Sequence, residues 1–192
     1  MILKITLISI IIFATIFLIL PGLLSSTKFI IEIHEIGHAQ EIQKFGNYPI
    51  YVYLNPEKCN NENNAGFTTS LTLKDLKDMI DQGNEDKKAK EAIKAIAEAG
   101  KLAEYNFVCD NPRKLKRIRY MPLRKVTYRW ARLKVDTRMK CNTKGSDSYI
   151  AKNPDKFVYI PVHDFTDFQK ENLYIYKNGE LEKIAYSKDL VG

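Results

Sequence analysis

The amino-acid sequence predicts an α+β protein with an N-terminal transmembrane helix, a body of helices and strands, and a β-rich C-terminal part. Three observations predict this class: an uninterrupted apolar run near the N-terminus, stretches with helical periodicity, and stretches in which apolar residues alternate. The chain has 192 residues, of which 45% are hydrophobic and 28% are charged, which suits one packed domain with a small appendage. This composition excludes collagen-like, low-complexity and wholly disordered proteins.

The apolar run covers residues 5–24 and contains no charged side chain. Its length, at about 1.5 Å per helical residue, matches the roughly 30 Å thickness of a hydrocarbon core. A cleaved signal peptide is the alternative, because Lys4 precedes the run and small residues follow it, but a signal core has only about 7–15 residues. We therefore expect residues 1–26 to form a single-pass membrane anchor, and the side of the membrane on which the body lies stays open.

One helix and two strands are expected directly after the apolar run. Helical periodicity predicts a helix over residues 27–45, with Gly46 as its stop. Apolar residues alternate with tyrosines over residues 50–54, which is typical of a strand. After a polar loop, a second strand is predicted over residues 66–71.

Two more helices follow these strands. Thr72 is expected to cap a short helix that ends by Gly83. A longer helix has small and apolar residues on one face, namely Ala89, Ala92, Ile93, Ile96, Gly100 and Ala103. Gly100 interrupts this face at a cost of about 1 kcal/mol, so we expect it to let another backbone approach closely.

The C-terminal part is predicted to be rich in strands. Residues 157–162 are β-prone, and residues 173–186 predict a hairpin that turns at Asn178-Gly179. The sequence thus divides into a membrane anchor (1–26), a domain with a basic insert (27–155, insert at about 108–144) and a β-rich C-terminal extension (156–192).

Positive charge is concentrated in one segment. The net charge is +7, but residues 113–144 contain thirteen Lys or Arg against one acidic residue, Asp136, which gives this segment +12. Such a block forms a solvated surface or contacts anionic lipid, and because it has no nucleic-acid-binding motif we expect no nucleic-acid partner. The chain has three cysteines, too few for a disulfide framework, although Cys109 and Cys141 would pair in an oxidising compartment.

The candidate chemistry lies in the first predicted helix. Residues 34–38, His-Glu-Ile-Gly-His, have the pattern H-E-x-x-H. Histidines four residues apart lie on the same helix face, where His34 and His38 can bind one zinc ion at about 2.0–2.1 Å. Glu35 then lies beside the metal, where it can take a proton from the metal-bound water and pass it to the leaving amine. This pattern predicts peptide-bond hydrolysis without a covalent intermediate.

Residues 34–46, H-E-I-G-H-A-Q-E-I-Q-K-F-G, resemble the metal-binding helix of zinc metallopeptidases of the FtsH peptidase type and of the site-two protease type. Residues 65–69, A-G-F-T-T, are similar to the G-x-T strand of the FtsH type, and residues 100–104, G-K-L-A-E, resemble its G-R-x-A-E helix. The resemblance covers about residues 28–107 and implies a zincin-like metallopeptidase domain. The L-D-G motif of site-two proteases is absent, and no AAA ATPase module fits in the chain. The resemblance therefore implies ATP-independent cleavage of flexible, exposed segments.

The sequence offers four candidates for the third metal ligand. The FtsH type takes it from an Asp in a stretch like G-A-S-x-D-x-x-x-A, which residues 145–151, G-S-D-S-Y-I-A, fit best, so the resemblance implies Asp147. Asp110 is the runner-up, because it directly precedes an Asn-Pro helix start. Glu104 and His163 also stay open, since carboxylates and imidazoles both bind zinc.

The sequence thus predicts a membrane-anchored zinc metallopeptidase that acts on a peptide or protein substrate. In this hypothesis the strand over residues 66–71 is a sheet edge that pairs with extended substrate backbone. The alternative is a catalytically inactive, membrane-tethered binding protein whose basic segment engages anionic lipid or an acidic partner.

Overall fold

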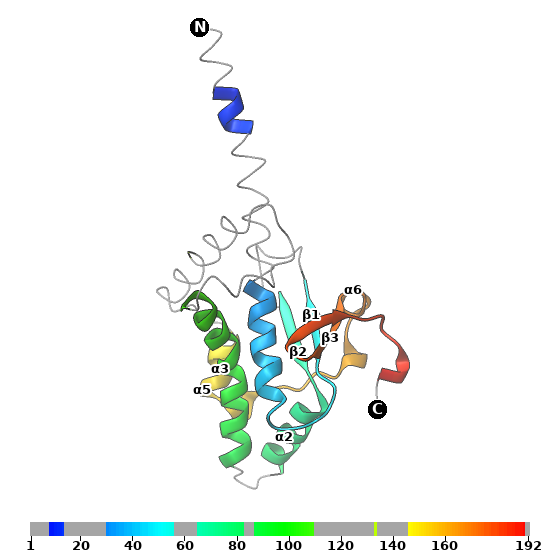
Figure 1. Ribbon diagram of the computed structural model, residues 1–192. Coiled ribbons are helices and arrows are strands. Elements are labelled where there is room, and N and C mark those ends of the chain that lie inside the picture. Colours follow the sequence, from blue (N-terminus) through cyan, green and yellow to red (C-terminus); the bar gives the residue numbers. More distant parts are fainter. Residues whose placement is uncertain are drawn as a thin grey trace.

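The computed structural model describes residues 8–13, 30–55, 65–82, 87–109, 133 and 146–190, with only the backbone of residues 108 and 109. These residues form an α+β fold in which helices pack on one face of a four-stranded sheet (Figure 1).

The sheet consists of four short antiparallel strands in the order β2-β1-β3-β4. The strands are β1 (Tyr51–Leu54), β2 (Gly66–Thr69), β3 (Leu173–Lys177) and β4 (Glu180–Lys183). Tyr53 of β1 lies opposite Phe67 of β2 on one side and Leu173 of β3 on the other. The C-terminal hairpin that the sequence placed in an extension is therefore continuous with the sheet of the N-terminal half.

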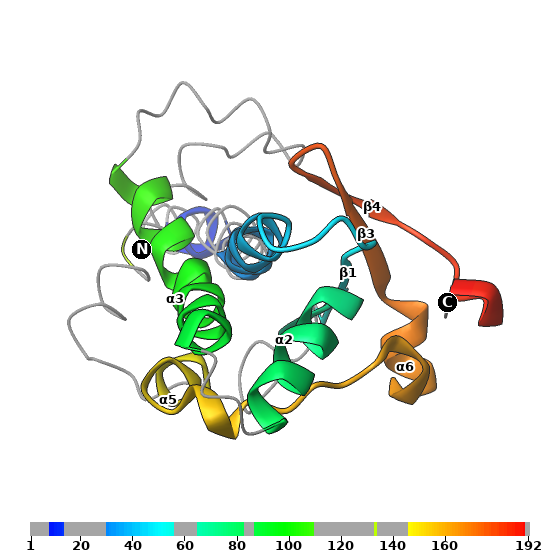
Figure 2. The same ribbon diagram turned by 90° about the horizontal axis from the view of Figure 1, so that it is seen from below.

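The helix of residues 30–42 lies between the sheet and α3 (Lys87–Cys109) in both views (Figures 1 and 2). Below the sheet in Figure 1, α2 (Leu71–Asp81) closes the same side. The core between these elements contains Ala39, Ile42, Ile50, Val52, Leu54, Leu73, Leu76, Ala92, Ile93 and Ile96. The even-numbered residues of β1 face this core, as the alternation in the sequence predicts.

The opposite face of the sheet is covered by the chain after α5. Its smaller core contains Tyr51, Tyr53, Val162, Phe165 and Leu173. The covering elements are η3 (Val162–Asp164), α6 (Asp167–Glu171) and η4 (Lys188–Leu190), whereas α5 (Ser146–Lys152) and η2 (Pro154–Lys156) pack against α3. Because both faces are covered, all four residues of β1 are buried, including its tyrosines.

Three local predictions have different outcomes. The hairpin turn is confirmed, because Asn178 and Gly179 both have positive φ, 51° and 85°, between β3 and β4. Thr72 does not cap α2: the cap is Ser70, whose side chain accepts a hydrogen bond from the Thr72 N–H. The second strand accordingly ends at Thr69.

The strand predicted over residues 157–162 is wrong. Residues 157–161 run between η2 and η3 without joining the sheet. Their contact with β2 is a side-chain bond, in which the Thr69 hydroxyl donates to the Ile160 carbonyl oxygen at 2.7 Å. Pro161 has no N–H to donate to a neighbouring strand, which explains why β-prone side chains alone do not add a strand here.

The predicted transmembrane helix and single-pass anchor are also corrected. Of the apolar run, the structure describes residues 8–13, which are helical. Across the described parts of the chain, no helix combines the length and the apolar character that a membrane span needs. The remaining residues of the run lie outside the described ranges.

Replacing Leu173 tests whether the C-terminal hairpin is part of the main fold. Leu173 is fully buried, with 0% of its surface exposed, so Leu173→Ala should lower the free energy of unfolding by about 2–5 kcal/mol. Urea unfolding measures this change, and Phe168→Ala on α6, where 45% of the side chain is exposed, is the matched control. A loss below about 1 kcal/mol for Leu173→Ala would show that the hairpin folds separately.

Candidate metal centre

Three side chains from two distant segments converge at one point. Nε2 of His34 lies 3.0 Å from Nε2 of His38 and 3.0 Å from Oδ2 of Asp147. Nε2 of His38 lies 3.8 Å from the same carboxylate oxygen. Both histidines come from the helix of residues 30–42, and Asp147 comes from the first turn of α5. Within the described ranges, these residues form the one group of His, Cys, Asp and Glu side chains arranged to hold a metal ion.

The outer nitrogen of each imidazole is held by a hydrogen-bond acceptor. Nδ1 of His38 donates to the main-chain carbonyl oxygen of Ile96 at 2.6 Å, which places the proton on Nδ1 and leaves a lone pair on Nε2. Nδ1 of His34 lies 2.7 Å from Oε1 of Glu104, to which it donates. Metal-binding histidines in proteins usually have such an acceptor behind them, which fixes the ring orientation.

Two glycines allow the helices to approach closely enough for this arrangement. A Cβ atom on Gly37 would lie 2.6 Å from Cβ of Ala103 and 2.7 Å from the carbonyl oxygen of Ala99, so a side chain there would push the helix away from α3. A Cβ atom on Gly100 would lie 2.6 Å from Nε2 of both His34 and His38. The close approach expected at Gly100 therefore involves two imidazole rings rather than another backbone.

Asp147 is positioned by contact between α5 and α3. Lys101 of α3 donates a short hydrogen bond to the hydroxyl of Ser148, the residue after Asp147. Ala151, one turn further along α5, is buried. These contacts hold the first turn of a seven-residue helix, which would be unstable alone, against the residues that carry Gly100 and Glu104.

Glu35 is buried next to this cluster, with 5% of its surface exposed. Its Oε2 accepts a hydrogen bond from the hydroxyl of Thr68 on β2 at 2.6 Å. The other side of the carboxylate lies against Gly66, where an added Cβ would be 2.6 Å from Cγ of Glu35. Glu35 therefore points from its helix toward the edge strand of the sheet.

The carboxylates around His34 strongly favour its charged form when no metal ion is bound. Burial alone would lower the pKa of His34, but hydrogen bonds with Asp147 and Glu104 and the charges of Glu35 and Glu104 outweigh it and raise the pKa to about 10. Burial opposes the charged form of Asp147 as well, but hydrogen bonds with His34 and His38 hold the pKa of its carboxyl well below the ordinary value. A proton on Nε2 of His34 and a metal ion would therefore compete for the same lone pair.

The donor set fits zinc. Ligand bonds of about 2.0–2.1 Å in a tetrahedral arrangement place neighbouring ligand atoms about 3.3–3.4 Å apart. The three distances here, 3.0, 3.0 and 3.8 Å, lie around this value. Two imidazoles and one carboxylate also leave a fourth position for water or substrate, as in catalytic rather than structural zinc sites.

The other candidate ligands are not in the group. Glu104 lies behind His34, at Nδ1. His163 is exposed in η3, where Nε2 lies 3.3 Å from the Asp164 carboxylate. Asp110 lies outside the described residues, as do Cys59, Cys141 and most of the basic insert, and the Cys109 side chain is not described. The predicted Cys109–Cys141 pairing therefore stays a prediction.

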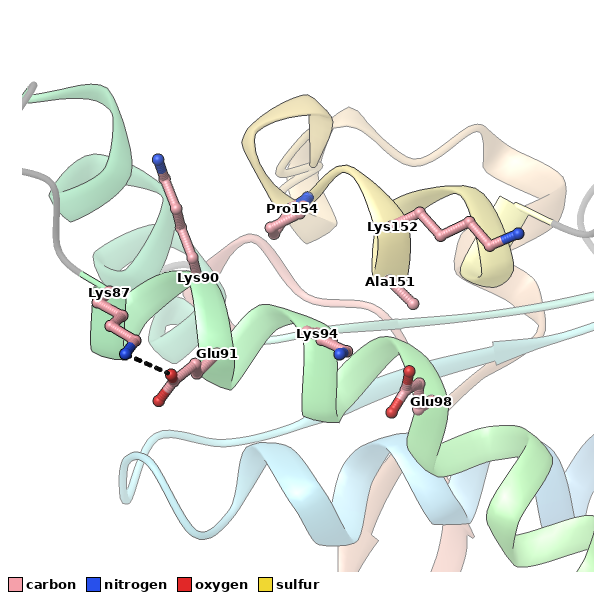
Figure 3. A pocket seen from close by; sticks show the side chains of 8 residues that line it. All are labelled: Lys87, Lys90, Glu91, Lys94, Glu98, Ala151, Lys152 and Pro154. Atoms are coloured by element: carbon pink, nitrogen blue, oxygen red, sulfur yellow. Dashed lines mark ion pairs between the residues drawn. The ribbon is translucent and has the colours of Figure 1, made fainter.

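A separate groove of about 680 Å³ lies between α3 and the turn from α5 to η2 (Figure 3). It is lined by Lys87, Lys90, Glu91, Lys94, Glu98, Ala151, Lys152 and Pro154. None of the residues around the metal cluster lines it. The side chains of Lys90 and Lys152 point away from one another in Figure 3, so the groove does not focus positive charge on one ligand position.

Sequence reasoning missed two groups that complete the site. In the sequence, Thr68 is only part of a stretch similar to the G-x-T strand, and no pattern of residues indicates its contact with Glu35. The Ile96 carbonyl could not be found from residue types, because every residue carries one. The i to i+4 spacing of Ile96 and Gly100 on α3 nevertheless places this carbonyl one turn from the glycine that faces the rings.

Comparison with known proteins gives no match, neither to a protein-family model, nor to a curated protein, nor to a solved structure.

Replacing Gly100 tests whether space between the imidazoles and α3 controls metal binding. Gly100→Ala should weaken zinc binding by about tenfold or more, because the new methyl group would overlap both Nε2 atoms. Isothermal titration with zinc measures the affinity, and Leu102→Ala, which alters an exposed residue of the same helix, is the control. Unchanged zinc affinity in Gly100→Ala, with the helical content preserved, would contradict the arrangement.

Zinc binding is expected to depend on pH, because zinc and a proton compete for Nε2 of His34. With a pKa of about 10, His34 is protonated at neutral pH, and the proton must leave when zinc binds. The apparent zinc affinity should therefore rise by about tenfold per pH unit between about pH 7 and 9. Competition with a chelating dye measures it. Glu104→Gln removes one carboxylate that raises the pKa of His34. The zinc affinity of this variant should therefore stop rising at a lower pH than that of the unaltered protein. A zinc affinity that does not change with pH in the unaltered protein would contradict competition between zinc and the proton.

Proposed function

We propose that this protein is a zinc-dependent peptidase that hydrolyses peptide bonds in flexible, exposed segments without ATP. The observation that supports it best is the convergence of His34, His38 and Asp147, with Glu35 next to His34 on the same helix. The similarity of the motif to the FtsH peptidase type remains a prediction in this proposal.

Each residue of the site has a distinct task. His34, His38 and Asp147 would hold the zinc ion, and Glu104 and the Ile96 carbonyl orient the two imidazoles. A zinc ion bound there lowers the pKa of a coordinated water and polarises the carbonyl of the scissile bond. Glu35 accepts a proton as water attacks that carbonyl and delivers it to the nitrogen of the leaving amine. No covalent link between protein and substrate forms.

The burial of these groups supports catalysis. Glu35, His38 and Glu104 have exposed fractions of 5%, 8% and 6%. Charges interact more strongly in such an environment than in water. The carboxylate of Glu35 would therefore interact with the charge of a bound zinc ion with little screening by water.

The edge of the sheet offers a place for the substrate backbone. Among the described strands, β2 pairs only with β1. The Asn55 N–H donates to the Ala65 carbonyl at 2.8 Å, so residues 55 and 65 form a hydrogen-bonded pair. Such pairs alternate along an antiparallel ladder with pairs that are not hydrogen-bonded, and the pairs 54–66 and 52–68 are of the second kind. The N–H and C=O groups of Gly66 and Thr68 therefore point away from β1. An extended peptide that adds to this edge would pass beside Glu35.

Replacing Glu35 tests the proposed mechanism. Glu35→Gln should lower the cleavage of an unfolded fluorogenic protein by about 10²–10⁴-fold, because the amide cannot accept the proton. Zinc content, measured by elemental analysis, should stay at the level of the unaltered protein. Glu41→Gln is the matched control, since Glu41 lies on the same helix and pairs with Lys44 at the surface.

Two results would contradict the proposal. One is undiminished cleavage by Glu35→Gln. The other is cleavage by the unaltered protein that persists after zinc has been removed with a chelator and returns no higher when zinc is restored.

A further inference from the structure

Thr68 holds the carboxylate of the proposed catalytic base from the opposite side of the site. We propose that Thr68 is a positioning residue: its hydroxyl fixes Oε2 of Glu35, so that Oε1 is the oxygen that takes and returns the proton. This inference rests on the proposed function and assigns a role within it to a residue outside the metal helix.

The contact is short and buried. The hydroxyl of Thr68 lies 2.6 Å from Oε2 of Glu35 and 3.5 Å from the main-chain oxygen of the same residue. A hydroxyl has one proton to donate, and the shorter contact to a charged acceptor is the stronger one. Thr68 is 9% exposed and Glu35 is 5% exposed, so water competes little for this bond.

The other carboxylate oxygen is placed differently. Oε1 lies on the side of Gly66, whose missing side chain leaves room for the carboxylate. Within the described part of the chain, no donor is found for Oε1. Of the two oxygens, Oε1 is therefore the one that no described donor occupies, and a proton can reach it without displacing the Thr68 hydrogen bond.

Thr68 is well suited to fix an oxygen because its own position is fixed. It lies in β2, opposite Val52 of the fully buried strand β1. Its branched Cβ restricts the first side-chain torsion, so the hydroxyl has few alternative directions. The carboxylate thus belongs to a residue of the helix, while a residue of the sheet sets its orientation. The Glu35 side chain therefore loses little conformational freedom when the reaction occurs.

This assignment defines where the proton goes in each step. As the water oxygen bonds to the substrate carbonyl carbon, one water O–H bond breaks and its proton moves to Oε1. When the C–N bond breaks, the same proton moves from Oε1 to the amine nitrogen. Oε2 keeps its bond from Thr68 throughout, so Glu35 ends in its starting state.

The test compares two substitutions of Thr68 with a control outside β2. Thr68→Val keeps the shape and removes the hydroxyl, and it should lower kcat by about tenfold with KM within about twofold of the unaltered value. Thr68→Ser restores the hydroxyl and should bring kcat back to within about threefold. Thr72→Val is the matched control: it removes a buried hydroxyl in the first turn of α2, outside the site and the substrate edge, and should leave kcat unchanged.

Infrared spectroscopy gives a second readout that needs no activity. The carboxylate band that disappears in Glu35→Gln should shift in Thr68→Val and in Thr68→Ala and return in Thr68→Ser. If the unaltered protein cleaves no substrate, the proposed function is wrong. The infrared band still shows whether Thr68 donates a hydrogen bond to Glu35. An unshifted band in both Thr68→Val and Thr68→Ala overturns the proposal, as does an equal loss of kcat in Thr68→Ser and Thr68→Val.

Discussion

The structure depends on the close packing of the helix of residues 30–42 against α3. This packing is possible because Gly37 and Gly100 lack side chains at the two points where the helices meet. The space at Gly37 is filled by α3 itself, and the space at Gly100 is filled by two imidazole rings. The same contact therefore stabilises the fold and brings Glu104 and the Ile96 carbonyl behind those rings.

A second constraint is the order of the strands. β1 lies at the centre, where it pairs with β2 on one side and with the C-terminal β3 on the other. Since β3 occupies one edge of β1, β2 remains at the end of the sheet next to Glu35. The C-terminal hairpin of β3 and β4 thus extends the sheet on the side away from Glu35, and it contributes no side chain to the metal cluster.

Much of the fold and part of the site follow from local sequence patterns. The spacing of His34 and His38 depends only on helix geometry, and the hairpin depends on the preference of Asn178-Gly179 for positive φ. Asp147 is different, because 113 residues separate it from His34, and no local pattern encodes a contact across that distance. The sequence indicates Asp147 only through a resemblance, and its carboxylate lies beside both imidazoles.

Other features could not be predicted because they depend on tertiary contacts. Ser70 rather than Thr72 caps α2, since Thr72 is buried under Gly46. Residues 157–161 have strand-forming side chains but no strand to pair with. The apolar run at the N-terminus satisfied a length criterion for membrane spans, yet in the part that the structure describes no helix meets it.

X-ray absorption at the zinc edge tests the central claim most directly. After the protein is loaded with one equivalent of zinc, the account predicts a first shell of two imidazole nitrogens and at least one oxygen at about 2.0–2.2 Å, with the carboxylate contribution altered in Asp147→Asn. A shell without two imidazoles, or one unaffected by Asp147→Asn, would contradict it.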